Sequence, residues 1–143
     1  MKLDEILGKK GREVVTIDDS RTVLEAARLL VERNIGSLVV VMDGRLRGII
    51  TERDVLRLTA GSPGDLDSLR VRDAMTRDVV TAKPNDDLRS TMDVMTERRI
   101  RHLPVVQDER LVGIVSIGDL VNACRISAEA ENSHLRQYIQ TAG

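Results

Sequence analysis

Aromatic side chains are almost absent from this chain of 143 residues, in which Tyr138 is the only Phe, Trp or Tyr. An aromatic stacking platform of the kind that binds single-stranded nucleic acid is therefore excluded. Hydrophobic residues still make up 41% of the chain and charged residues 31%, a balance typical of globular proteins. We expect an aliphatic core built from Val, Ile, Leu, Met and Ala.

Cysteine and long apolar runs are also scarce. Cys124 is the only cysteine, so one chain forms neither an internal disulfide nor a four-cysteine zinc site. No segment approaches the roughly 18 consecutive apolar residues of a membrane helix, and the polar N-terminus has no apolar stretch typical of a secretion signal. These features predict a soluble cytoplasmic protein with no membrane partner.

Neither sign of charge dominates, since the formal net charge is -1. A near-neutral chain has no global attraction to nucleic acid or to an acidic membrane surface. One alternative stays open, because Arg98, Arg99 and Arg101 would form a nucleic-acid surface if all three lay on one open face. The charge balance and the missing aromatics favour the absence of a nucleic-acid partner.

Sequence motifs of catalysis are missing as well. The chain contains no Gly-x-x-x-x-Gly-Lys-Ser/Thr phosphate loop, no Gly-x-Gly-x-x-Gly motif, and no Ser or Cys nucleophile with a plausible base. His102 and His134 are the only histidines, and they lie in different predicted elements. We therefore expect neither enzymatic activity nor a metal site.

A polar cluster at a predicted strand-to-helix junction is the most informative feature that is present. Residues 48–54 are predicted to form a short buried strand that ends in the hydroxyl of Thr51 and opens a helix with a cation and a carboxylate. The pattern returns 65 residues later, over residues 113–119, with Ser116 in place of the threonine. Two related junctions are thus built into one chain.

The chemistry of each junction suits a phosphorylated, hydroxyl-bearing ligand. A helix N-terminus offers free N–H donors to phosphate, a carboxylate accepts both hydroxyls of a cis-diol, and an arginine fork adds charge-assisted hydrogen bonds. The alternative is structural, because Asp54 and Asp119 stand where a carboxylate caps a helix. Capping and phosphate contact do not exclude each other.

The second half of the chain repeats the first at the constant offset of 65 residues. Val14-Val15-Thr16 matches Val79-Val80-Thr81, and Val40-Val41 matches Val105-Val106. Each repeat is predicted to run strand, helix, hairpin of two strands, helix. One such repeat is too small to bury its own apolar strands, so we predict an α/β (α+β) fold in which two βαββα repeats pack about a pseudo-twofold axis and form two clefts.

The expected organisation along the chain follows from these repeats. In order, we predict an N-terminal helix over residues 1–11 that caps the first repeat, repeat 1 over 12–60, a linker with a short helix over 61–76, repeat 2 over 77–126, and a C-terminal helical extension over 127–143. Asp18-Asp19-Ser20 is the predicted cap of the helix over 23–33, and the helix over 52–59 is expected to end before Gly61. The last helix is expected to begin at Ile117 and reach Leu135, Tyr138 and Ile139, with a break near Ser127.

The duplicated Gly-x-x-Thr/Ser-x-x-Asp junction, together with His102-Leu103-Pro104-Val105, resembles the tandem cystathionine β-synthase (CBS) domain pair, also called a Bateman module. The resemblance covers about residues 12–126, and the absence of an attached catalytic domain resembles the free-standing bacterial form. It implies a regulatory sensor for an adenosine nucleotide (AMP, ADP, ATP or NAD(H)), a disc-like homodimer, and an unknown regulated protein. The alternative is a structural dimerisation module with vestigial clefts.

The resemblance also implies which residues line the clefts. In the family, the motif aspartate binds the ribose, the motif Thr or Ser and nearby basic residues bind the phosphates, and the first and middle strands of the other repeat bind the base. One cleft would combine Thr81, Arg101, His102 and Pro104 with Thr51, Arg53 and Asp54, and the other would combine Thr16, Ser37 and Val39 with Ser116 and Asp119. Gly118 stands where the first junction has Arg53, so we expect tighter phosphate binding in the Arg53 cleft.

Overall fold

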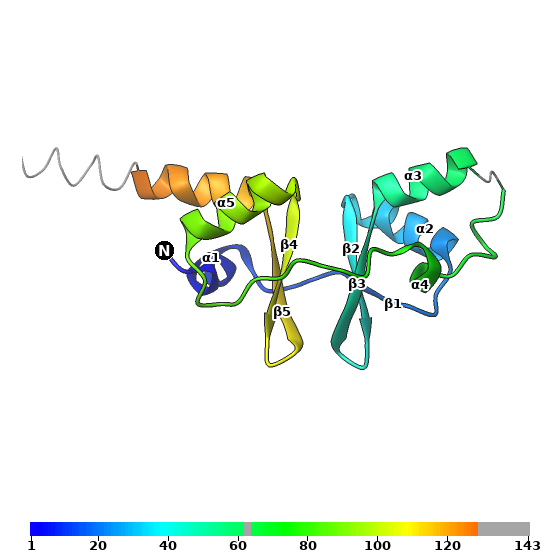
Figure 1. The fold of residues 1–143 in the computed structure, drawn as a ribbon, viewed down its shortest axis with the longest axis horizontal. Helices are drawn as coiled ribbons and strands as arrows, with labels where there is room; N and C mark the ends of the chain where they lie inside the picture. Colours follow the sequence, from blue (N-terminus) through cyan, green and yellow to red (C-terminus); the bar gives the residue numbers. More distant parts are fainter. Residues whose placement is uncertain (62–63, 129–143) are drawn as a thin grey trace, which may run out of the picture.

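The computed structural model describes residues 1–61 and 64–128, in two halves of similar build that lie side by side (Figure 1). In chain order the elements are α1 (Leu3–Lys10), β1 (Thr16–Asp18), α2 (Val23–Arg33), β2 (Ser37–Met42), β3 (Arg45–Thr51), α3 (Glu52–Gly61), α4 (Val71–Ala74), α5 (Leu88–Arg98), β4 (His102–Gln107) and β5 (Arg110–Ser116). A further helix covers residues 117–128. The predicted mixed α/β class is confirmed.

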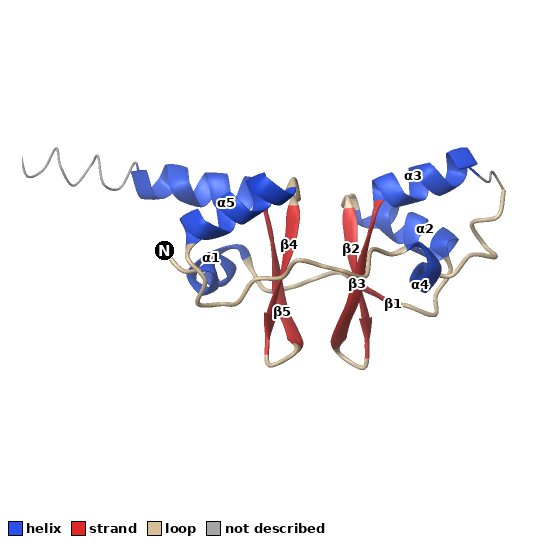
Figure 2. Ribbon diagram, viewed as in Figure 1, coloured by secondary structure: helices blue, strands red, loops and turns tan. Residues whose placement is uncertain are grey.

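The strands form one sheet in the order β1-β2-β3-β5-β4. Figure 2 shows the two hairpins at the centre of the molecule, with helices toward both outer ends. Within the described part of the chain, the hairpins pair with each other only through Arg45 and Arg110. Both hairpins carry a register irregularity, between Val40 and Val41 in one and at the matching place of repeat 2 in the other. The repeat is therefore preserved down to the detail of strand pairing.

Each half has its own aliphatic core, but the short helices that precede the repeats are exchanged between the halves. Leu3, Ile6 and Leu7 of α1 belong to the core of the second repeat, together with Met95 and Leu103. Our expectation that the N-terminal helix caps the first repeat was therefore wrong. Adjacency in sequence does not decide which apolar surface a helix buries.

Helix α4 makes the reciprocal exchange. Val71 and Met75 are buried in the core of the first repeat. The backbone repeats the arrangement too, since Leu3 N donates to Asp86 O at 3.0 Å and Val71 N donates to Arg21 O at 2.8 Å. Each repeat is thus closed by a helix that leads into the other repeat, as Figure 1 shows for α1 beside β5 and α4 beside α2.

The glycine that begins each junction motif is explained by these exchanged helices. A Cβ on Gly113 would lie 2.7 Å from Cδ2 of Leu7, and a Cβ on Gly48 would lie 2.6 Å from the carbonyl oxygen of Thr76 and 2.7 Å from Sδ of Met75. Real Cβ atoms do not approach other heavy atoms so closely. The motif glycines therefore let the exchanged helices approach the hairpins.

The first strand of repeat 2 differs from our prediction. A strand was expected around Val79, but that segment makes a single parallel bridge, between Ala82 and Val105. In repeat 1 the amide of Val39 donates to Val15 O at 3.4 Å, whereas the matching residue is Pro104, which has no N–H to donate. The missing donor shortens this strand to the bridge.

Three helix ends also differ from expectation. The cap of α2 is Thr22, whose hydroxyl accepts from Glu25 N at 3.1 Å, whereas Asp18 accepts from Ser20 N at 2.8 Å within its own turn. Helix α3 extends through Gly61, and the last helix passes through residue 127 without a break. Leu135, Tyr138, Ile139 and the rest of the predicted extension beyond residue 128 lie outside the described residues.

Candidate functional site

The first predicted junction is a reciprocal helix cap. The hydroxyl oxygen of Thr51 accepts from the Asp54 amide at 3.2 Å, and Oδ2 of Asp54 accepts from the Thr51 amide at 2.9 Å and from its hydroxyl at 3.0 Å. This is the capping role that the sequence left open, and it fixes the carboxylate at the start of α3. Both bonds to Asp54 use Oδ2, and Oδ1 has no hydrogen-bond partner among the described residues.

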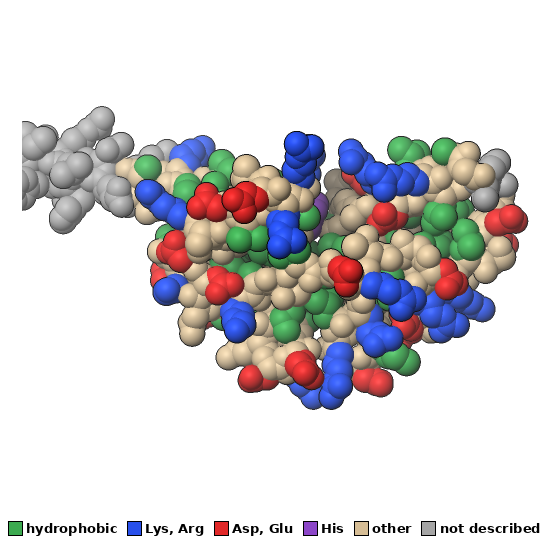
Figure 3. All heavy atoms as spheres, in the orientation of Figure 1, with side chains coloured by type: hydrophobic (Ala, Val, Ile, Leu, Met, Phe, Trp, Pro, Cys, Tyr) green, Lys and Arg blue, Asp and Glu red, His purple; other side chains and the backbone are tan. Residues whose placement is uncertain are grey.

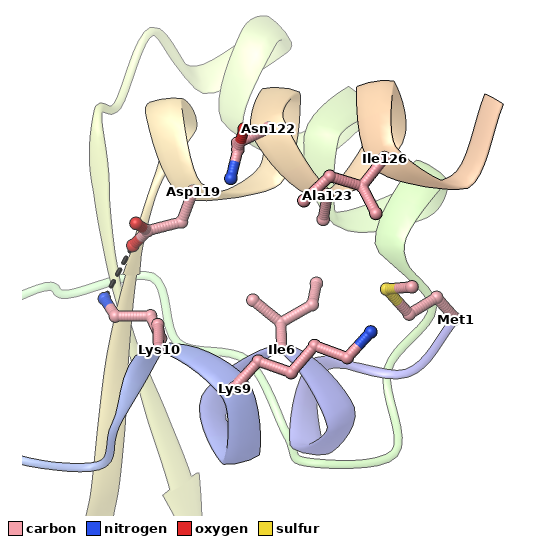
Figure 4. Close-up of a pocket in the computed structure, with 8 residues that line it drawn as sticks. All are labelled: Met1, Ile6, Lys9, Lys10, Asp119, Asn122, Ala123 and Ile126. Carbon is pink, nitrogen blue, oxygen red and sulfur yellow. Dashed lines mark hydrogen bonds and ion pairs between the residues drawn. The ribbon is translucent and has the colours of Figure 1, made fainter. Parts of the chain in front are cut away.

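The second junction repeats this cap and adds a cation. Oδ2 of Asp119 accepts from Ser116 N at 2.8 Å, and Ser116 Oγ accepts from Asp119 N at 3.0 Å. The ammonium group of Lys10, at the end of α1, lies 2.6 Å from the same Oδ2 and donates to the carbonyl oxygen of Ile114 at 2.8 Å (Figure 4). No ion pair of this kind forms at Asp54 within residues 1–61 and 64–128.

The Lys10 contact changes the ionisation of Asp119. Partial burial by itself raises the pKa of the Asp119 carboxyl, but the hydrogen bonds from Lys10 and Ser116 outweigh it, and the pKa is lowered from its usual 3.8. Asp119 is therefore ionised at neutral pH and bound to a cation of its own chain.

A basic hollow brings the two repeats together. Arg53 from the start of α3 and Arg101 from just before β4, which were predicted in the same cleft, both line a cavity of about 340 Å³. Arg99, the residue after α5, lines it too. None of these three arginines forms an ion pair with any described residue. Basic side chains gather on both rims of the hollow between the halves in Figure 3.

Arg99 was missed as a cleft residue in the sequence, where it counted only toward a nucleic-acid surface. It adopts the left-handed conformation at the end of α5, with φ 55°, as Asn34 does at the end of α2 with φ 53°. Asparagine is common in this conformation and arginine is not. The alignment of Arg99 with Asn34, 65 residues earlier, therefore marked Arg99 as an unusual residue for the end of a helix. The corresponding cavity of repeat 1 is lined by Asn34 and Glu52 and contains no arginine.

His102 lies where charges of both repeats meet. It is partly buried, and burial lowers the pKa of its imidazole from the usual 6.5; Lys10 and Arg101 act in the same direction, whereas Asp119 and Glu52 oppose the change. Since Glu52 begins α3 of the other repeat, charges of both repeats act on His102. The imidazole is neutral at pH 7.

Two strand pairings join predicted site residues that the resemblance assigned to different clefts. Ser37 pairs with Thr51 in the first hairpin, and His102 pairs with Ser116 in the second. Thr16 pairs with Val39, which was assigned to the same cleft, and Pro104 pairs with Ile114, which was not a predicted site residue. The middle strand of each repeat thus lies beside the junction of the same repeat. Contacts between the repeats depend on side chains that extend from one repeat toward the other.

The two predicted groups are brought together to different degrees. Arg53 and Arg101 meet across the repeats, and Thr81 stands next to the bridge that Ala82 makes to β4. No hydrogen bond or ion pair of the described residues joins Thr16, Ser37 and Val39 to Ser116 and Asp119. Lys10, which the sequence did not single out, holds Asp119 instead.

Other kinds of site find no support in the described ranges 1–61 and 64–128. These residues include no group of three or more His, Cys, Asp or Glu side chains placed to hold a metal ion. None of the helices found there is both long enough and apolar enough to cross a bilayer.

Comparisons with known proteins agree with this architecture. The family model described as CBS domain matches residues 10–61 and 71–126. The mitochondrial CBS domain-containing protein CBSX3 of Arabidopsis thaliana is 37% identical over 149 residues, which cover 96% of this chain and 71% of that protein. A CBS-domain containing protein of known structure from Agrobacterium tumefaciens is 40% identical, with a TM-score of 0.80 over 86% of this chain and 98% of that one.

The similar solved structures include complexes with ligands. The CBS domain pair of protein MJ0100, in complex with 5-methylthioadenosine and S-adenosyl-L-methionine, is 29% identical, with a TM-score of 0.77 over 89% of this chain and 98% of that one. The family model matches both halves, and the fold has the duplicated architecture of these relatives. The chain therefore belongs to the CBS domain family, as a tandem pair of CBS repeats.

Proposed function

We propose that this CBS pair is a regulatory module that binds an adenosine nucleotide between its repeats, in the cleft that contains Thr51, Arg53 and Asp54. The observation that carries the proposal is the meeting of Arg53 with Arg99 and Arg101 in one hollow, with no ion-pair partner for any of them in the described part of the chain. Three like charges in one cavity repel each other, and an anionic ligand relieves that repulsion.

The neighbouring groups suit the other parts of a nucleotide. Oδ1 of Asp54 is available for the ribose hydroxyls, because the helix cap occupies only Oδ2. His102 is neutral and partly buried, and with Thr81 and Pro104 it would contact the base. The adenosine-containing ligands in the related MJ0100 pair support the ligand class, and AMP, ADP, ATP and NAD(H) all share the adenosine group.

The second cleft, with Thr16, Ser37, Val39, Ser116 and Asp119, is proposed to bind the same ligand class more weakly. Its junction has Gly118 in place of Arg53, and its aspartate is paired with Lys10. We expect phosphate to be held less tightly there, in keeping with the smaller number of cations.

Ligand binding would act through the relative pose of the repeats. The hairpins pair at one residue pair only, so a ligand that contacts both halves adds a cross-link where few backbone bonds exist. A pose that binds the ligand more tightly becomes more populated when the ligand is present. The proposed module acts in the cytoplasm, has no enzymatic activity, and passes this change to a regulated protein through a homodimer.

A structural role in dimerisation is the second candidate, and exposed apolar side chains favour it. Val31 of α2 is 81% exposed, Leu56 of α3 is 69% exposed, and Val121 of the last helix is 51% exposed. A purely structural module predicts that the dimer and partner binding are unaffected when Arg53 and Asp54 are replaced. The nucleotide-binding module predicts the loss of a ligand response in the same variants.

Titration calorimetry with AMP, ADP, ATP and NADH tests the proposed function. We expect heat of binding for at least one of these ligands and its loss in Arg53→Ala and Asp54→Ala. Arg57→Ala is the matched control, because Arg57 is an exposed arginine of the same helix, about one turn further along. Absence of heat and of a thermal shift with all four ligands at millimolar concentration would overturn the proposal.

A further inference from the structure

The two junctions differ in one contact that neither repeat symmetry nor capping requires. The ammonium group of Lys10 lies 2.6 Å from Oδ2 of Asp119, and both side chains are mostly shielded from solvent, with exposed fractions of 30% and 28%. The Thr51 junction has the same cap but no cation on Asp54 within the described residues. Among the described residues, the motif carboxylate is therefore paired with a cation in the second junction but not in the first.

The cause of this difference is the length of the exchanged helices. Helix α1 has eight residues and α4 has four. After α4, the chain pairs with β3, where Thr76 N donates to Ile49 O at 2.9 Å. The matching carbonyl in repeat 2, that of Ile114, instead accepts from Lys10 at 2.8 Å. The longer helix α1 thus brings the ammonium group of Lys10 to a carbonyl whose counterpart in repeat 1 accepts from a backbone amide.

Lys10 is held in this position by rigid neighbours. Leu7, one turn earlier on α1, is fully buried and packs on Gly113, and α1 ends at Gly11 with φ 109°. In Figure 4 the ammonium group of Lys10 points at Asp119, whereas Lys9 extends along a different direction of the same cavity. An ion pair between preorganised, partly buried groups loses less side-chain entropy than an exposed pair.

We propose that Lys10 is an internal competitor for Asp119. It neutralises the carboxylate, disfavours binding of a nucleotide ribose in the Ser116–Asp119 cleft, and leaves the Thr51–Asp54 cleft as the single high-affinity site of the chain. This inference rests on the proposed function and deepens it, because it states which cleft binds ligand and why. Among the described residues, Oδ1 has no hydrogen-bond partner in either carboxylate, because the contacts of Asp54 and of Asp119 both use Oδ2. Lys10 neutralises the charge of Asp119, however, so its Oδ1 is the weaker acceptor for a ribose hydroxyl, whereas no such cation compensates Asp54.

Lys10→Gln is the informative variant, since the amide still donates to the carbonyl of Ile114 while the cation on Asp119 is removed. Calorimetric titration with ADP should give one site per chain in the unsubstituted protein and two sites in Lys10→Gln. The affinity of the second site should rise by about tenfold or more, the equivalent of one charge-assisted hydrogen bond. Lys9→Gln, one residue earlier on the same helix, is the matched control and should bind one ADP.

The Asp54→Ala background separates the two clefts. We expect Asp54→Ala to bind ADP weakly or not at all, and the double variant Asp54→Ala with Lys10→Gln to regain one site. Lys10→Met, with circular dichroism to verify folding, gives an independent removal of the charge and should also bind two ADP.

Each contrary result has a distinct meaning. One unchanged site in Lys10→Gln and in Lys10→Met, or weaker binding in either, would overturn the inference on Lys10 while the proposed function stands. Two equal sites in the unsubstituted protein would do the same. If the unsubstituted protein binds neither ADP nor any of the other three adenosine ligands, the proposed function itself fails, and the inference fails with it.

Discussion

Leu7 of α1 rests directly on Gly113 of β5, where a Cβ atom would lie 2.7 Å from its Cδ2. This contact explains why the junction motif of repeat 2 begins with glycine, and it joins the N-terminal helix to the second half of the chain. Substitutions at the motif glycines therefore test the exchange of helices between the halves.

Alanine at either motif glycine should destabilise the fold. We expect Gly113→Ala to reduce the free energy of unfolding by about 1–3 kcal/mol, the usual cost of overpacking a core. The loss should be larger for Gly48→Ala, because one atom that its Cβ would meet is the backbone oxygen of Thr76, which moves less readily than a leucine side chain. Urea unfolding followed by circular dichroism measures both.

Gly61→Ala is the matched control for these variants. Gly61 is the last residue of α3, and nothing lies within 4 Å of a Cβ added there. Its free energy of unfolding should change by no more than about 0.5 kcal/mol. Equal effects at Gly61 and Gly113 would contradict the packing explanation.

The reciprocal cap at Thr51 and Asp54 predicts that stability and ligand binding respond to different substitutions. Thr51→Ala removes the acceptor for the Asp54 amide and should cost about 1 kcal/mol of stability, whereas Thr51→Ser keeps the hydroxyl and should cost less. Asp54→Asn keeps an oxygen that accepts from the Thr51 amide, so its unfolding should stay close to that of the unsubstituted protein. If the carboxylate also binds a ribose, Asp54→Asn should lose nucleotide affinity in calorimetry despite its retained stability.

The sequence predicted the repeat and its elements because both depend on local pattern. Periodic helices and valine-rich strands indicate each hairpin unit. In repeat 1 the Asp43-Gly44 pair also indicates the turn, and both residues take the positive φ that the turn requires. What the sequence did not reveal depends on contacts between distant residues. The capping of repeat 2 by α1 and the Lys10–Asp119 pair arise only when the halves are docked.

The shortened first strand of repeat 2 could be predicted from the sequence only in part. The match of Val79-Val80-Thr81 to Val14-Val15-Thr16 correctly aligned the repeats but overstated the strand. Pro104 carried the necessary information, because a proline opposite an expected parallel strand removes one of its hydrogen-bond donors. Pro104, which we had considered only as part of a family motif, thus also shortens the neighbouring strand.

Burial of His102 predicts how stability depends on pH. Its pKa in the folded protein lies below the usual 6.5, chiefly because burial disfavours the imidazolium form. The unfolded chain therefore binds a proton that the folded chain does not, at any pH between the two values. The contribution of His102 to stability should be fully present above pH 6.5 and should be lost as the pH falls toward the folded pKa.

His102→Gln should remove this pH dependence. We expect the difference in free energy of unfolding between the unsubstituted protein and His102→Gln to shrink or change sign from pH 7.5 to pH 5.5, as measured by urea unfolding at several pH values. A difference that stays constant over this range would show that the imidazole has the same pKa in both states.

Arg99 allows a prediction about which part of the nucleotide the basic hollow recognises. Because Arg99 lines the hollow with Arg53 and Arg101 and has no ion-pair partner among the described residues, its replacement should weaken binding of a long phosphate tail most. Arg99→Ala should lower the affinity for ATP by about tenfold, the loss of one charge-assisted contact, and the affinity for adenosine by much less. Arg98→Ala, at the end of α5 and outside the residues that line the hollow, is the control and should leave both affinities close to those of the unsubstituted protein. Equal losses for ATP and adenosine in Arg99→Ala would mean that Arg99 shapes the cleft rather than binding the phosphates.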